Sequence, residues 1–141
     1  MSSVTLKFTG ELGEVIEMVI PELPAGEKFE RWGQAIVQVQ SENASLKSDF
    51  GIEHSDVQHL LAQLIKVSPS KTVEWETMEG NVGLEFKTSA LGNVELSAVV
   101  SSSKTFCRSA TFRMPVTIQQ VEKVISQLEK SLSPEYKKLC G

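Results

Sequence analysis

The chain has 141 residues, of which 40% are apolar and 23% charged, so it can form one globular domain with its own core. Its formal net charge of −4 and pI near 5.2 argue against nucleic acid as a partner, because phosphate binding needs clustered Lys and Arg. The 14 basic residues are scattered, and the densest cluster, Lys137-Lys138, is expected to be a solvated part of the C-terminus.

Cysteine usage and the N-terminal sequence indicate a cytoplasmic protein. Cys107 and Cys140 match no metal-ligand or redox spacing, so we expect free thiols in a reducing compartment. The first residues carry no basic region ahead of an apolar core, and no apolar stretch approaches the roughly 18 residues of a membrane span. We therefore expect neither a signal peptide nor a membrane segment.

The N-terminal part is predicted to be rich in β-structure. Alternation of apolar and polar residues predicts four short strands, which pair as two hairpins: 4–8 with 16–20, and 35–39 with 44–48. The first hairpin turns at Gly10–Gly13 and the second around Ser41–Asn43. The stretch 22–33 between the two hairpins looks irregular.

Two amphipathic helices are predicted further along the chain. Ser55 can cap the first, and Gln58 three residues later completes a capping box. Thr117 and Gln120 repeat this pattern before the second helix, which Pro134 ends. Their apolar stripes comprise Val57, Leu60, Leu61, Leu64 and Ile65 in the first helix, and Ile118, Val121, Val124, Ile125, Leu128 and Leu132 in the second.

Four strands are predicted between these helices, joined by short polar turns as a meander: roughly 71–78, 81–88, 93–101 and 105–113. The order of elements predicts one α+β domain spanning residues 1–141. It consists of an antiparallel meander sheet, an additional N-terminal β-rich part, and two amphipathic helices packed on one face. The pattern does not decide whether the first 32 residues belong to the same sheet.

Carboxylates gather on the side of the predicted meander that faces away from the core. Pairing across the Gly80-Asn81 turn places Glu74 opposite Glu85, with Glu76 further along the same strand. The register that we expect for the next strand places Glu95 beside Glu85. Three carboxylates would then lie side by side, and each adjacent pair would cost about a few tenths of a kcal/mol on an exposed sheet.

Three interpretations of these carboxylates are open. They can be ordinary polar residues on a solvated face, with Lys87 and Arg113 nearby. They can also form an acidic strip for a basic partner, whose binding would relieve the repulsion. A metal site is disfavoured, because side chains that spread from a flat sheet rarely converge on one ion.

No catalytic or cofactor-binding group stands out, so we expect neither an enzyme nor a cofactor. His54 and His59 are too far apart in sequence to share one helical face, and both are expected at the surface. Cys107 has no evident base beside it. Trp32 and Trp75 are expected to anchor the core, and Trp32 is the better candidate for partial exposure and partner contact.

Two stretches carry a family resemblance: WETMEGNVGLEFKTSALGNVELSAVV at 75–100 and FRMPVTIQQVEKVISQL at 112–128. Together with the preceding strand pair and helix, they resemble bacterial immunity proteins of the WapI type over approximately residues 33–132. The chain departs from that pattern in two places. The family's usual Asp before the last helix is absent at Pro115–Thr117, and its frequent His after the glycine is Asn93.

The resemblance implies a non-enzymatic protein-binding module that neutralises a cognate bacterial toxin by covering its active site or substrate groove. A nuclease toxin would have a basic groove, which an acidic sheet face would fit. The partner-binding residues expected on this basis are Glu74, Glu76, Glu85, Glu95 and Trp32. Two alternatives are a small-ligand-binding or enzymatic domain, with its site between the sheet and 22–33, and a subunit of a larger assembly. The sequence leaves the oligomeric state open.

Overall fold

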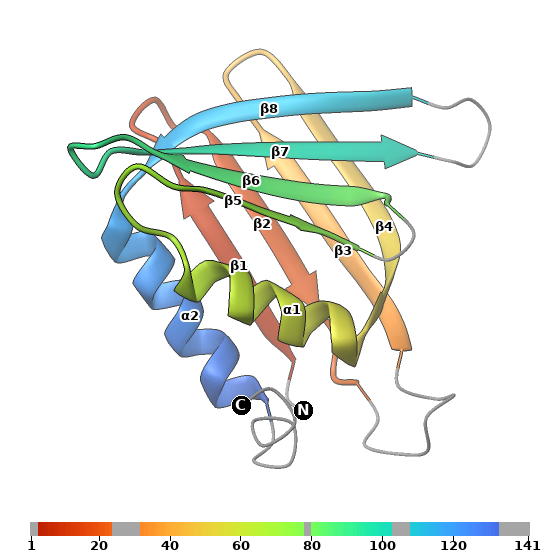
Figure 1. Cartoon of the computed structure of the whole chain (residues 1–141). Helices are drawn as coiled ribbons and strands as arrows, with labels where there is room; N and C mark the ends of the chain where they lie inside the picture. The colour runs from red at the N-terminus through yellow and green to blue at the C-terminus, as the bar shows by residue number, and fades with distance from the viewer. Residues whose placement is uncertain (1–2, 24–31, 78–79, 103–107, 133–141) are drawn as a thin grey trace.

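The computed structural model describes residues 3–23, 32–77, 80–102 and 108–132. These residues form two four-stranded antiparallel sheets and two helices, as the predicted α+β class requires (Figure 1). The first sheet comprises β1 (Val4–Thr9), β2 (Val15–Ile20), β3 (Trp32–Gln40) and β4 (Ser45–Glu53). The second comprises β5 (Thr72–Glu76), β6 (Val82–Thr88), β7 (Val94–Ser102) and β8 (Arg108–Val116). Helix α1 (His54–Ile65) joins the sheets, and α2 (Ile118–Ser131) follows the second.

Alternation of more buried and more exposed residues explains why most of these segments form strands. In β1, for example, Val4, Leu6 and Phe8 are buried while the residues between them are exposed. The buried faces of the two sheets point toward each other, and the Phe8 and Phe86 ring centroids lie 5.6 Å apart. The N-terminal strands therefore form a sheet of their own rather than extending the meander.

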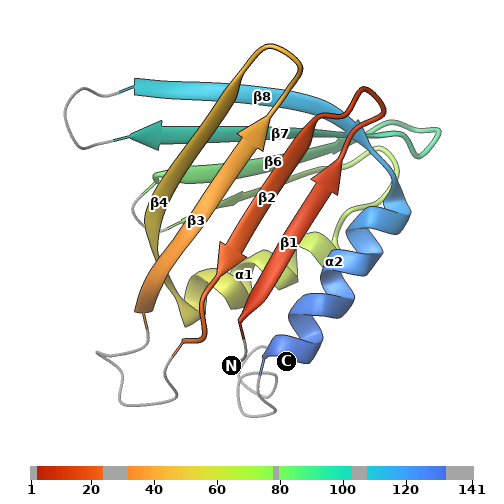
Figure 2. The ribbon, with the colours of Figure 1, turned by 180° about the vertical axis from the view of Figure 1, so that it is seen from behind.

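Both helices lie on the inner side of the first sheet, next to the second sheet (Figures 1 and 2). Helix α1 packs against β5 and α2 against β1, and the helices also pack against each other. Leu60 and Val124 lie with residues of both sheets around a residual internal cavity of only about 10 Å³. A second small cavity, of about 30 Å³, lies between Ile16 of the first sheet and Phe112 and Met114 of the second. The described residues of the sheets and helices therefore leave only small voids at these two places.

The predicted start of α1 was wrong by two residues. The helix begins at His54 with Glu53 as its N-cap, whereas Ser55 was expected to cap it. The backbone N–H of Glu53 donates to Oδ2 of Asp56 at 2.9 Å, and this bond fixes the first turn. Because β4 passes into α1 without a loop, His54 turns inward and is only 3% exposed. The expectation that His54 lies at the surface was therefore also wrong.

The predicted cap of α2 is confirmed, with one difference. The Thr117 hydroxyl oxygen accepts a hydrogen bond from the Gln120 backbone N–H at 3.2 Å. The Gln120 side chain does not return to Thr117 as a capping box requires. Instead, its amide bonds the backbone N–H and C=O of Thr9 at 2.8 and 2.9 Å, which ties the start of α2 to the end of β1.

The last strand lies further along the chain than predicted. It covers 108–116 rather than 105–113, so Pro115 is part of β8 instead of leading into the helix. Proline lacks a backbone N–H, and β8 tolerates it because it is an edge strand. Several sequence features lie outside the described residues: Cys107, Cys140, Lys137-Lys138, Pro134 and most of 22–33.

Candidate partner-binding surface

The outer face of the second sheet brings two of the predicted carboxylates together as expected. Glu74 on β5 lies directly opposite Glu85 on β6. The Thr77 N–H donates to the Val82 carbonyl at 3.0 Å, so Thr77 and Val82 form a hydrogen-bonded pair. Since such pairs alternate along an antiparallel ladder, Glu74 and Glu85 occupy a non-hydrogen-bonded pair, in which side chains approach more closely.

The predicted register between β6 and β7 was wrong by two residues. Glu85 lies opposite Ser97, and Glu95 lies opposite Lys87. The turn before β7 sets this register: Gly92 adopts a φ of 87°, and the N–H of Ser89 donates to the carbonyl of Asn93 at 2.9 Å. A shift of two residues keeps every side chain on its predicted face, so the apolar alternation could not reveal it.

The charge on this outer face therefore changes from one edge to the other. A single cross-strand row runs from Glu74 through Glu85 and Ser97 to Arg113 on the edge strand β8. In the part of the chain that the structure describes, no hydrogen bond or ion pair occupies the side chains of Glu74, Glu76 or Glu85. The acidic end of the face is thus available to a basic group from outside.

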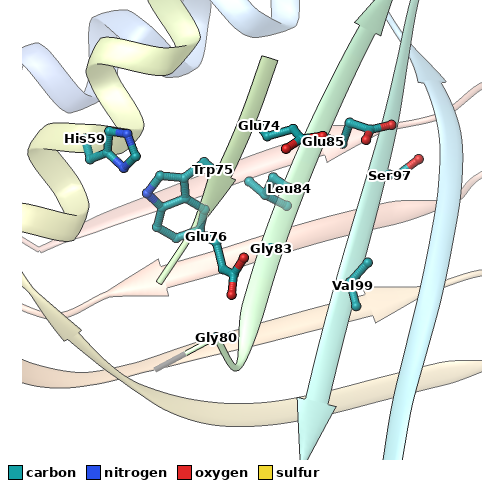
Figure 3. Close-up of a pocket in the computed structure, with 10 residues that line it drawn as sticks. All are labelled: His59, Glu74, Trp75, Glu76, Gly80, Gly83, Leu84, Glu85, Ser97 and Val99. Atoms are coloured by element: carbon teal, nitrogen blue, oxygen red, sulfur yellow. The ribbon is translucent and has the colours of Figure 1, made fainter. Parts of the chain in front are cut away.

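An open hollow of about 470 Å³ lies at this acidic end (Figure 3). Its lining includes Glu74, Glu76, Glu85, His59, Gly83 and Val99. Glu76, Gly83 and Val99 form the row next to that of Glu74 and Glu85, on strands β5, β6 and β7. We refer to this feature as the acidic hollow. Sequence reasoning missed Gly83, although a glycine inside a strand often marks a place where another group approaches the backbone.

The two histidines have different positions. His59 is exposed on α1, as predicted, and its Nε2 lies 3.1 Å from Nε2 of Gln63. It forms the helical wall of the acidic hollow, across the edge of β5 (Figure 3). Buried His54 does not line it. No group of three or more His, Cys, Asp or Glu in the described residues could hold a metal ion.

The two tryptophans are likewise separated by the fold. Trp75 is 2% exposed, which confirms it as a core anchor, and its indole N–H donates to the Asp56 carbonyl at 2.9 Å. Trp32 begins β3 in the first sheet and pairs with Glu53, whereas the acidic hollow lies on the second sheet. The Trp32 side chain lies outside the described part of the structure, so its contact with a partner stays a prediction.

No helix in the described ranges is long and apolar enough to cross a bilayer.

Comparison with solved structures shows a related fold. A structure described as that of the plant transcriptional regulator PBF-2 superposes with a TM-score of 0.52 at 13% sequence identity, covering 91% of this chain and 78% of that chain. At this identity the likeness concerns the fold alone. No curated protein matches the sequence significantly.

Comparison with protein families extends the resemblance seen in the sequence. The profile of the immunity protein WapI-like family matches residues 7–134, which include the second half of β1, all the other strands and both helices. The match begins in the first hairpin, upstream of the stretch 33–132 that carried the resemblance. The chain therefore belongs to the immunity protein WapI-like family.

Proposed function

We propose that this protein neutralises a cognate bacterial toxin by binding it with the outer face of the second sheet and covering its active site or substrate groove. The observation that carries this proposal is the unrelieved pair of Glu74 and Glu85 at the rim of the acidic hollow. Like charges directly opposite each other destabilise a sheet, and a basic partner surface would remove that cost on binding.

The chemistry of this face supports a basic toxin surface, such as the substrate groove of a nuclease. Glu74, Glu76 and Glu85 would steer association with such a groove and then occupy the positions of substrate phosphates. Glu95 lies on the same face but opposite Lys87, so it would act at the margin of the interface. No catalytic step is needed, because a bound immunity protein excludes the substrate.

The filled interior favours a binding module over a small-ligand enzyme. Around the described residues, the cavities between the sheets and helices are about 10 and 30 Å³, whereas ligand sites are typically about 300–1,000 Å³ and enclose most of the ligand. The larger acidic hollow is open and lies on the outside of the second sheet (Figure 3). We place this activity in the bacterial cytoplasm, where the toxin would meet its immunity protein.

Co-expression tests this function. The candidate toxin is the variable C-terminal domain of a large protein encoded immediately upstream, and it is induced with and without this chain. We expect growth arrest with the toxin alone, rescue by the wild-type chain, and co-purification of the two proteins. A Glu74→Lys/Glu85→Lys variant that folds normally should rescue poorly. Full rescue by that variant would contradict the assigned surface, and absence of both rescue and binding by the wild-type chain would contradict neutralisation of this toxin.

A further inference from the structure

Gly83 is the second residue of β6, at a position where glycine has no evident structural purpose. Glycine inside a strand destabilises it, because it loses more conformational freedom on folding and has no side chain to pack. The backbone of Gly83 does not adopt a positive φ, unlike that of Gly80 and Gly92. A Cβ placed on it would meet only the Trp75 carbonyl oxygen, at an ordinary 3.5 Å. Neither backbone conformation nor packing therefore requires glycine at this position.

The missing side chain matters instead for the acidic hollow. Gly83 faces outward between Glu76 on β5 and Val99 on β7. The next row on the same face begins with the Glu74–Glu85 pair. Any larger residue at position 83 would project into the space that these side chains surround (Figure 3). The hollow thus combines a bare stretch of backbone, the apolar Val99 and three carboxylates.

We propose that the acidic hollow receives one arginine side chain that projects from the toxin surface. This inference rests on the proposed function, because it names the group that the same surface binds. The aliphatic stem of the arginine would lie over Gly83 and Val99, and its guanidinium would reach the Glu74–Glu85 pair. Arginine fits better than lysine, because its planar fork can donate to two carboxylates at once, whereas an ammonium acts as a point charge.

The charge of the hollow supports this occupant. Glu74, Glu76 and Glu85 contribute three negative charges, and their side chains have no partner among the described residues. A single bound guanidinium would offset the repulsion between Glu74 and Glu85 and leave a net attraction for further basic groups at the rim. Arginine in a central pocket is also a frequent energetic hot spot of protein interfaces.

An NMR titration tests the inference without the toxin. The probes are N-acetyl-arginine methylamide and N-acetyl-lysine methylamide, added to the ¹⁵N-labelled full chain. We expect saturable shifts at the amides of 74–76, 83–85 and 97–99, and binding of the arginine probe at least about fivefold tighter than that of the lysine probe. Two carboxylates outside the hollow serve as references: Glu95 on β7 and the exposed Glu122 on α2. Equal affinity for the two probes, or shifts of similar size around these references, would overturn the proposal.

Gly83→Val supplies the decisive variant, because it fills the hollow without changing its charge. Its affinity for the arginine probe should fall at least about tenfold, with a smaller loss for Gly83→Ala. Thr111→Val, on β8 in the same cross-strand row, is the matched control and should bind like the wild type. Gly83→Ala keeps the test valid if the valine variant does not fold. Unchanged affinity in a folded Gly83 variant would overturn the arginine site.

Experiments with the toxin then distinguish the arginine site from the proposed function. If Gly83→Val neutralises the toxin as well as the wild type does, the arginine site is wrong while the proposed function stands. If the arginine probe binds in the hollow but the wild-type chain binds no toxin, the proposed function fails and the site remains. If the complex of the Gly83→Val variant with the toxin dissociates faster than the wild-type complex but associates at nearly the same rate, the result supports both the proposed function and the arginine site.

Discussion

Glu74 and Glu85 face each other across a non-hydrogen-bonded position of the β5–β6 ladder, with no cation paired to either among the described residues. Cross-strand side chains are closest at a non-hydrogen-bonded pair, so distance does not relieve the repulsion between these two carboxylates. Ser97 continues the row, and the first basic group in it is Arg113 on β8. The fold thus maintains an unfavourable pair at the rim of an open hollow, as expected where a partner supplies the opposite charge.

Neutralising one member of the pair should stabilise the free protein. We expect Glu85→Gln to raise the free energy of unfolding by about 0.2–0.5 kcal/mol at low ionic strength, because it removes a like-charge contact. The gain should shrink in about 0.5 M salt, where screening already weakens the repulsion. Urea unfolding of the variant and the wild type, at low salt and at the higher salt concentration, measures this difference in unfolding free energy. Glu95→Gln is the control and should give no gain, since Glu95 lies opposite Lys87; equal stabilisation by both variants would contradict this explanation.

The Trp75 indole N–H donates to the Asp56 carbonyl and so ties α1 to β5. Helix α1 carries His59, which forms one wall of the acidic hollow. Trp75→Phe removes the buried donor and part of the ring, so unfolding free energy should fall by about 1–3 kcal/mol. The loss should be accompanied by faster hydrogen exchange at the start of α1, which this bond holds against β5. Urea denaturation and exchange measured by NMR check the two effects. A loss below about 0.3 kcal/mol would show that the indole bond contributes little.

Gln120 should contribute to the attachment of α2 through its two bonds to the Thr9 backbone. We expect Gln120→Ala to lower the unfolding free energy by about 1–2 kcal/mol, since each hydrogen bond contributes about 0.5–1.5 kcal/mol. The Thr9 amide should also exchange faster with solvent. Gln119→Ala changes the exposed neighbour in the same helical turn and is the matched control. Similar losses for the two variants would mean that the Thr9 contact is not what stabilises this junction.

The sequence was sufficient to predict most elements, because most strands alternate between apolar and polar residues and both helices carry an apolar stripe. The strand β4 was predicted to end at residue 48 but runs to Glu53, since its apolar alternation is interrupted at Ser48. It also predicted the Glu74–Glu85 pair, since the turn that contains Gly80 leaves little freedom in the β5–β6 register. The register of β7 failed because a two-residue shift preserves the buried face. One feature of the sequence pointed to the correct register of β7. Leu91-Gly92 before β7 repeats Leu12-Gly13 of the first hairpin, and both glycines adopt a positive φ in their turns.

Other features depend on contacts between distant segments and could not be read from local patterns. His54 is buried because β4 continues directly into α1, which no spacing rule reveals. The acidic hollow needs His59 from α1 beside strands β5, β6 and β7, and sequence alone does not place that helix against the edge of β5. The separation of Trp32 from the hollow follows from the division into two sheets, which the order of strands left undecided.

The most direct test of the central claim is the association rate with the cognate toxin as a function of salt. For the wild-type chain we expect fast association that slows steeply as salt rises, because the acidic hollow steers a basic surface. Glu74→Lys/Glu85→Lys should slow association at low salt at least about tenfold and flatten the salt dependence, while Glu95→Lys has a smaller effect. The same rate and the same salt slope for the folded double variant and the wild type would contradict the claim that this surface binds the toxin.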